Sequence, residues 1–142
     1  LVSAAERNGL LAVAVTLNAP DDWNDHKKML DFCFASYETV TLAEIGQISV
    51  NIPCVGGNKS TVHCTNLDSV RLTLPKGSEV STTIEADRYY PAPVKVGDAL
   101  ATAKLYSSGQ LIAAIPLYAE SEVKVNEGRL SLLDRILRLL GR

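Results

Sequence analysis

Two short segments of this 142-residue chain have the residue spacing of a nucleophilic active site. Residues 121–124 read Ser-Glu-Val-Lys, a Ser-x-x-Lys spacing in which a lysine can activate a serine for acyl transfer, and residues 49–51 read Ser-Val-Asn. That chemistry needs the serine and the lysine one helical turn apart on one face, whereas residues i and i+3 of a strand face apart. Val123 and Val125 alternate as strand residues do, the order of the two motifs is reversed, and the chain contains no Lys-Thr-Gly. We therefore predict no catalytic residues in this chain.

The cysteines and histidines suggest no further reactive site. His63 and Cys64 are neighbours in a strand-like run, so their side chains face apart and cannot form a dyad. Three cysteines without a Cys-x-x-Cys spacing and two histidines do not make a zinc or thioredoxin-like site. Cys54 and Cys64 flank a turn-like segment, and either they form a disulfide across a hairpin or they are, with Cys33, small buried hydrophobic residues. Only the register of that hairpin distinguishes a disulfide from buried free cysteines.

Acidic residues gather with a histidine at the start of a predicted helix. Asp21, Asp22, Asp25 and His26 carry metal-ligating atoms, and a hydrolase working through Asp22, Asp25 and His26 is one interpretation. Acidic side chains also interact favourably with the N-terminus of a helix, and one of the first two aspartates suits the N-cap position. Helix capping explains the acids without any ion, so we predict no metal and no cofactor.

The elements that would position these residues begin with a hairpin. Asn8-Gly9 accepts the positive φ angles of a type I′ turn, which predicts antiparallel strands over residues 1–7 and 10–17. The second strand is apolar on both faces, as a strand is when layers cover both sides. Because the chain has no initiator Met, we expect its missing neighbours to lie outside the chain. Pairing of two copies through strands 1–17 is the alternative.

A helix is predicted to follow over residues 21–37. Apolar and aromatic side chains recur there every three or four residues, which indicates an amphipathic helix. The predicted buried face consists of Trp23, His26, Leu30, Cys33, Phe34 and Tyr37.

From residue 43 the pattern changes to six short alternating runs separated by turn residues, which indicates a small antiparallel sandwich or barrel. The boundary between the two units is predicted near residues 39–44. We therefore predict an α+β protein in three parts: a strand-strand-helix unit over 1–42, a β-sandwich over 43–128 and a C-terminal helix over 129–142.

The C-terminal segment separates into an apolar and a basic half when plotted at about 100° per residue. Such a helix suits an anionic membrane surface, and docking onto the β unit is the alternative. The predicted membrane-facing residues are Leu133, Ile136, Leu137, Leu140, Arg135, Arg138 and Arg142.

Composition excludes two classes of partner. A net charge of -2 gives no electrostatic basis for binding nucleic acid. The longest apolar run covers only residues 10–15, which is too short to span a bilayer.

The whole chain resembles a known family. Residues 1–38, LVSAAERNGLLAVAVTLNAPDDWNDHKKMLDFCFASYE, closely resemble the end of the catalytic domain in serine-type D-alanyl-D-alanine carboxypeptidases, the low-molecular-mass penicillin-binding proteins of peptidase family S11. The remainder is similar to the C-terminal β domain of that family, through residues 48–53 (ISVNIP) with Gly56-Gly57, 74–77 (LPKG), 92–98 (APVKVGD) and 115–117 (IPL). An amphipathic anchor helix follows in the family.

This resemblance implies an exported enzyme, peripheral on the outer face of the cytoplasmic membrane, that trims the terminal D-Ala from peptidoglycan stem pentapeptides. The family's catalytic residues would lie upstream of Leu1, so the segment alone should be inactive. By family analogy the substrate-cleft edge includes Asp21, Asp22, Trp23 and Asn24, although no basic residue stands here to meet the substrate carboxylate. A free-standing, non-catalytic β module that binds a protein or cell-wall partner is the alternative.

Overall fold

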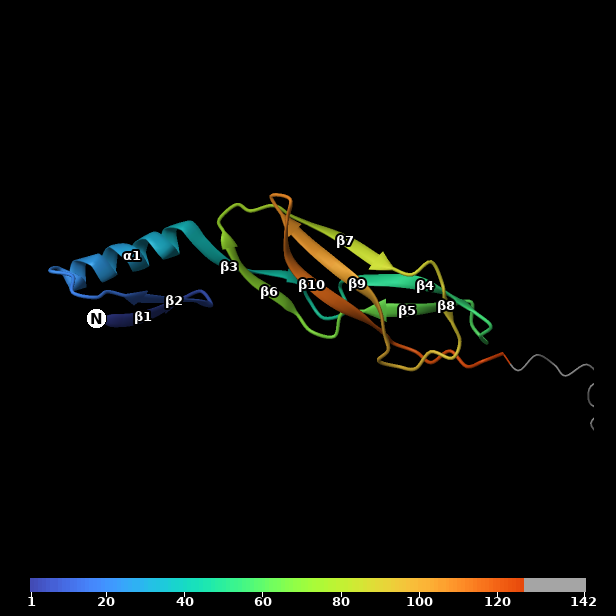
Figure 1. Ribbon diagram of the computed structural model, residues 1–142. Helices are drawn as coiled ribbons and strands as arrows, with labels where there is room; N and C mark the ends of the chain where they lie inside the picture. Colours follow the sequence, from blue (N-terminus) through green and yellow to red (C-terminus); the bar gives the residue numbers. More distant parts are fainter. Residues whose placement is uncertain (127–142) are drawn as a thin grey trace, which may run out of the picture.

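The computed structural model describes residues 1–126, which are mostly β-sheet with one helix (Figure 1). The predicted tail helix over residues 129–142 lies outside the described residues. The elements, in chain order, are β1 (Val2–Arg7), β2 (Leu10–Val15), α1 (Asp22–Ser36), β3 (Tyr37–Ala43), β4 (Ser49–Val55), β5 (Thr61–Thr65), β6 (Val70–Pro75), β7 (Val80–Ala86), β8 (Tyr90–Pro91), β9 (Ala99–Ser107) and β10 (Gln110–Ala119).

The predicted N-terminal hairpin is confirmed. β1 and β2 pair antiparallel from Val2 opposite Val15 to Arg7 opposite Leu10. The connecting residues Asn8 and Gly9 have φ angles of 52° and 78°. Both values are positive, as a two-residue type I′ turn requires, so the turn sequence sets the register of the hairpin.

Helix α1 lies along one face of this hairpin (Figure 1). Leu10 and Ala12 of β2 are buried against Phe34 of α1. The prediction that Trp23 belongs to the buried face is wrong, because its side chain is 78% exposed. His26 already contacts the open end of the hairpin, and Trp23 lies about one helical turn further out, beyond the last paired residues.

Strand β3 follows α1 without an intervening loop. Tyr37, predicted to be on the buried helix face, is the first residue of β3, and its side chain is 39% exposed. β3 pairs antiparallel with β6, from Tyr37 opposite Pro75 to Ala43 opposite Val70. Residues 39–43, where the sequence suggested a boundary, therefore lie within a strand of the β unit.

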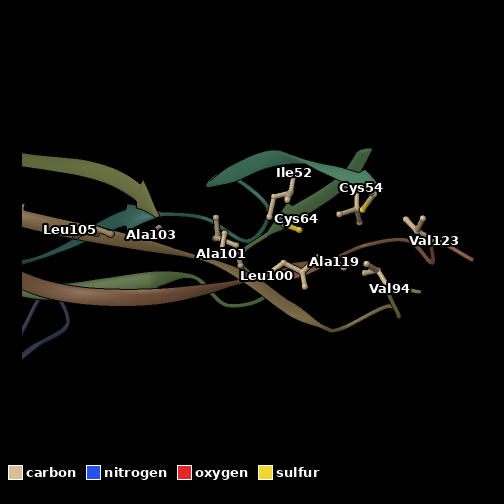
Figure 2. Packing of buried hydrophobic residues seen from close by; sticks show 12 residues of the cluster. Ile52, Cys54, Cys64, Val94, Leu100, Ala101, Ala103, Leu105, Ala119 and Val123 are labelled. Atoms are coloured by element: carbon tan, nitrogen blue, oxygen red, sulfur yellow. The ribbon is translucent and has the colours of Figure 1, made fainter. Parts of the chain in front are cut away.

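The six predicted strands of the β unit all form, and they surround one core. The larger sheet has the order β7-β9-β10-β5-β4-β8, and β3-β6 forms a separate two-stranded sheet. Leu42 of β3 and Val70 of β6 pack against the buried residues of the larger sheet, so the two sheets share this core. Figure 2 shows its side chains, which come from β4, β5, β9, β10 and the segments around Val94 and Val123.

The last predicted strand is shorter than expected. The alternation predicted strand through Val125, but β10 ends at Ala119. Val123 and Val125 instead make isolated antiparallel bridges with Val94 and Gly57. Val123 is fully buried, so the alternation reflects real burial outside a continuous strand.

The register of β4 and β5 explains why the two cysteines of that hairpin are free. Val50 lies opposite Cys64, and Pro53 lies opposite Thr61. The Cys54 N–H donates to the Ser60 carbonyl at 2.8 Å, so Cys54 and Cys64 are offset by four residues along the strand. This offset is about 13 Å, well beyond the reach of a disulfide. Cys33, Cys54 and Cys64 are all free thiols.

Within residues 1–126, no helix combines the length and the hydropathy needed to cross a bilayer.

Candidate functional site

The turn between β2 and α1 contains the residues predicted at a substrate-cleft edge. Asp21 is the N-cap of α1, and its carbonyl accepts the backbone N–H of Asp25 at 3.0 Å. Its carboxylate makes no capping bond to the backbone but accepts the Asn24 side-chain amide at 2.9 Å through each oxygen. The Trp23 side chain is exposed to solvent. Asp21, Asp22, Trp23 and Asn24 therefore lie together at the start of one helix.

A chain of polar side chains ties this turn to the hairpin. His26, which is 3% exposed, lies 2.6 Å from the Ser3 hydroxyl through Nδ1 and 2.9 Å from the Thr16 hydroxyl through Nε2. The Thr16 hydroxyl donates to Asp22 Oδ1 at 2.8 Å. The four residues come from β1, the position directly after β2 and the first two turns of α1. Sequence reasoning found His26 and Asp22 but missed Ser3 and Thr16.

The acidic residues of the turn are engaged with protein groups. Asp22 accepts from Thr16, Asp21 accepts from Asn24, and Asp25 lies 3.8 Å from the ammonium of Lys28. In the part of the chain that the structure describes, no group of three or more His, Cys, Asp or Glu residues is placed to hold a metal ion.

The Ser-x-x-Lys segment does not form a nucleophile–base pair. The Ser121 hydroxyl accepts a hydrogen bond from the ammonium of Lys59 at 3.1 Å. Lys124 lies 3.9 Å from the carboxylate of Glu122, at the surface. Between them, Val123 points into the core. Ser121 and Lys124 therefore have separate partners.

His63 and Cys64 face apart, as predicted. His63 is exposed and its Nδ1 lies 2.9 Å from Asn51 Oδ1. Cys64 is fully buried, and burial, with smaller contributions from Cys54 and Glu120, raises the pKa of its thiol. A thiol that stays protonated is a poor nucleophile, so Cys64 has a packing role.

The hairpin has a second face that nothing in the described residues covers. Leu11 and Val13 of β2 are 64% and 62% exposed, and Val2 and Val15 beside them are also exposed. Glu6, opposite Leu11, is the charged residue in this row. We call Val2, Leu11, Val13 and Val15 the open face of the hairpin. It confirms the expectation that β2 is apolar on both sides.

The end of α1 is held by the β unit. The last turn of α1 contains no basic residue of its own. Lys76, in the turn after β6, donates its backbone N–H to the Ser36 carbonyl at 2.9 Å and its ammonium to the Phe34 carbonyl at 2.8 Å. It thereby satisfies carbonyls that a helix leaves without intrahelical partners. Residues 74–77 were noted in the sequence only as part of the family resemblance, which did not predict this contact.

Comparison with known proteins places this architecture in a family. A sequence model described as "Penicillin-binding protein 5, C-terminal domain" matches residues 37–125, from the first residue of β3 to the bridge at Val125. The chain belongs to this family.

Individual relatives match a larger part of the chain than the family model does. The D-alanyl-D-alanine carboxypeptidase DacF of Bacillus subtilis (strain 168) is 27% identical over 143 residues, covering 96% of this chain and 36% of the relative. Penicillin-binding protein 5 from Haemophilus influenzae has a similar structure, with a TM-score of 0.70 at 25% identity over 87% of this chain and 38% of that one. DacD from Francisella tularensis shares the fold, with a TM-score of 0.61 at 23% identity over 89% of this chain and 33% of that one.

The DacF match covers 96% of this chain, so it extends beyond residues 37–125 and includes most of the hairpin and α1. The chain spans 36% of the length of the curated relative and 38% of the Haemophilus structure. The resemblance to the C-terminal part of D-alanyl-D-alanine carboxypeptidases is confirmed.

Proposed function

We propose that this chain is the C-terminal portion of a serine-type D-Ala-D-Ala carboxypeptidase that trims peptidoglycan stem pentapeptides in cell-wall synthesis. The observation that carries the proposal is the open face of the hairpin, joined through α1 to a β domain of this family. A strand with one apolar face packed and the other exposed is suited to the interior of a larger layered sheet. The names of the relatives supply the reaction.

In this proposal the catalytic residues lie outside residues 1–142, and this portion alone is inactive. The separate partners of Ser121 and Lys124 and the buried, protonated Cys64 support that part of it. The chain alone should therefore form no covalent adduct with a labelled penicillin, as measured by intact mass. An adduct on Ser121 would contradict the proposal.

The turn at the start of α1 is proposed to border the substrate cleft. Asp21, Asp22, Trp23 and Asn24 support this role because they lie together at the open end of the hairpin and Trp23 is free to contact a ligand. They would form an edge of the cleft and would not take part in bond breaking.

The division into 1–42, 43–128 and 129–142 assigns each part a role. The hairpin and α1 of the first part would complete the catalytic domain, the second part together with β3 would act as a spacer, and the third would bind the membrane from the extracytoplasmic side. The described chain leaves the β domain at the end opposite to β1, β2 and α1, which suits a spacer (Figure 1).

The proposed membrane contact has a direct test. Leu133, Ile136, Leu137 and Leu140 would enter the interface while Arg135, Arg138 and Arg142 meet anionic lipid. Each arginine would contribute about 1 kcal/mol at low salt, and added salt screens this electrostatic contribution but not the contribution of apolar burial. Leu137→Asp should therefore weaken co-sedimentation with anionic vesicles more than Arg138→Gln. If deleting residues 130–142 leaves binding unchanged, the tail is not the anchor.

The open face of the hairpin would be covered by the rest of the catalytic domain. Pairing of two copies through residues 1–17 is the alternative, because a second copy could also bury the exposed Leu and Val side chains.

The proposed function is tested in cells. A tag is added at the C-terminus of the chromosomal copy, and the cells are labelled with a fluorescent penicillin. The expected result is one species, larger than 15.3 kDa, that carries both the tag and the label. A tagged species without the label would contradict the proposal and favour a free-standing β module.

A further inference from the structure

His26 is a buried imidazole that the proposed reaction does not use. Its ring lies between two hydroxyl groups, Ser3 Oγ at Nδ1 and Thr16 Oγ1 at Nε2, at 2.6 and 2.9 Å. Within residues 1–126 no buried side-chain nitrogen or oxygen lacks a hydrogen-bond partner. Both ring nitrogens are therefore satisfied by side chains from other elements.

The carboxylate of Asp22 sets the direction of the hydrogen bonds as far as His26 Nε2, and a neutral imidazole then sets the direction of the bond to Ser3. An ionised carboxylate only accepts, so the single Thr16 hydroxyl proton goes to Asp22 Oδ1, at 2.8 Å. Thr16 Oγ1 must then accept from His26, which requires a proton on Nε2. In the neutral ring Nδ1 carries none, so it accepts the hydroxyl proton of Ser3. Ser3 therefore donates to His26, His26 donates to Thr16, and Thr16 donates to Asp22.

We propose that His26, as the neutral Nε2–H tautomer, is a positioning residue that fixes the start of α1, and with it Asp22, against the hairpin. This inference rests on the proposed function for its consequence, which is that the cleft edge at residues 21–24 is held in place before a substrate arrives. His26 is buried, so it would act through its hydrogen bonds to Ser3 and Thr16, and through Thr16 on Asp22, without touching a substrate.

The local contacts of the turn cannot replace this connection. The bonds between Asn24 and Asp21 join residues of the same helix start and do not reach the hairpin. The backbone N–H of Thr16 donates to the Leu1 carbonyl at 3.0 Å, which ends the ladder between β1 and β2. The side chain of Thr16 then connects this ladder end to α1 through two bonds.

The tautomer can be measured on the wild-type chain by ¹⁵N NMR of its two histidine rings. The expected result for His26 is a protonated Nε2 and an unprotonated Nδ1. His63 is the internal reference, because it is exposed and has Asn51 as its partner. A protonated Nδ1 with a bare Nε2, or the averaged signals of a solvent-exposed ring, would overturn the proposal.

The positioning role is tested by hydrogen exchange in matched variants. Thr16→Val removes the hydroxyl at nearly constant shape and should make the first-turn amides of α1, including that of Asp25, exchange about tenfold faster. Thr16→Ser keeps a hydroxyl and should restore slow exchange, and His63→Gln should change nothing there. The β1–β2 amides are expected to keep their wild-type rates in Thr16→Val.

Equal acceleration of the hairpin amides and of the helix start, or no acceleration at either, would overturn the proposal. None of these measurements depends on carboxypeptidase activity, so a failed inference is distinguishable from a failed functional proposal.

Discussion

The hairpin–helix unit and the β domain differ in how completely they bury their apolar strand faces. Both bury apolar strand faces, but in the β domain Leu105 and Leu117 are almost completely enclosed. In the hairpin, Leu10 is buried by α1 whereas Leu11, the next residue, is 64% exposed. Burying a large apolar side chain contributes about 1.5–3 kcal/mol. The β domain therefore contains its own core, and the hairpin requires a further layer to complete one.

The largest expected difference between the two regions is in the free energy of unfolding, and substitution of one leucine in each region measures it. Leu117→Ala should lower the free energy of unfolding by about 2–5 kcal/mol, because it leaves a cavity in an enclosed core. Leu11→Ala, at the open face, should change it by less than about 0.5 kcal/mol. Urea denaturation followed by circular dichroism measures both. Equal losses would mean that the open face is covered in the chain alone.

The next effect concerns the junction of the two regions. Lys76→Met keeps the length of the side chain but removes its bond to the Phe34 carbonyl, which should destabilise the end of α1 by about 1 kcal/mol. Hydrogen exchange should then accelerate in the last turn of α1 and not in β9 or β10. Lys59→Met, which removes the surface bond to Ser121, is the control. Unchanged exchange in α1 would show that the backbone bond of Lys76 alone holds the junction.

The smallest effect is a pH dependence confined to the β domain. The pKa of Cys64 is raised above the ordinary thiol value of 9.0 because the side chain is buried. As the pH rises above that value, the unfolded chain releases the thiol proton before the folded protein does, so stability falls. Cys64→Ala should have a shallower loss of stability in this alkaline range than the wild type. A parallel loss in both proteins would contradict this role for Cys64.

The sequence revealed elements whose signals are local. Asn8-Gly9 specified the hairpin because positive φ angles at both positions favour those residues. β3 was missed because it continues directly from α1 with no Gly or Pro between them, so its alternation was taken for a connection. Trp23 was misplaced because helical periodicity does not show where the partner layer ends.

The candidate site was likewise only partly predictable from the sequence. The acidic turn and His26 were visible as a cluster along the chain. Their partners were not, because Ser3 lies 23 residues from His26 and Lys76 lies 42 residues from Phe34. Such contacts depend on the register of β1 and on the position of the turn after β6. No local pattern contains that information.

The open face of the hairpin is proposed to be a buried layer of a larger protein, and the solution state of the chain alone tests this most directly. Light scattering and hydrogen exchange would be recorded on the wild type and on Val13→Glu, which charges the open face. The wild type is expected either to associate beyond its monomer mass of 15.3 kDa or to exchange its amide protons rapidly over residues 10–15. Where it associates, Val13→Glu should restore the monomer. A wild-type monomer of 15.3 kDa with residues 10–15 fully protected would contradict the claim.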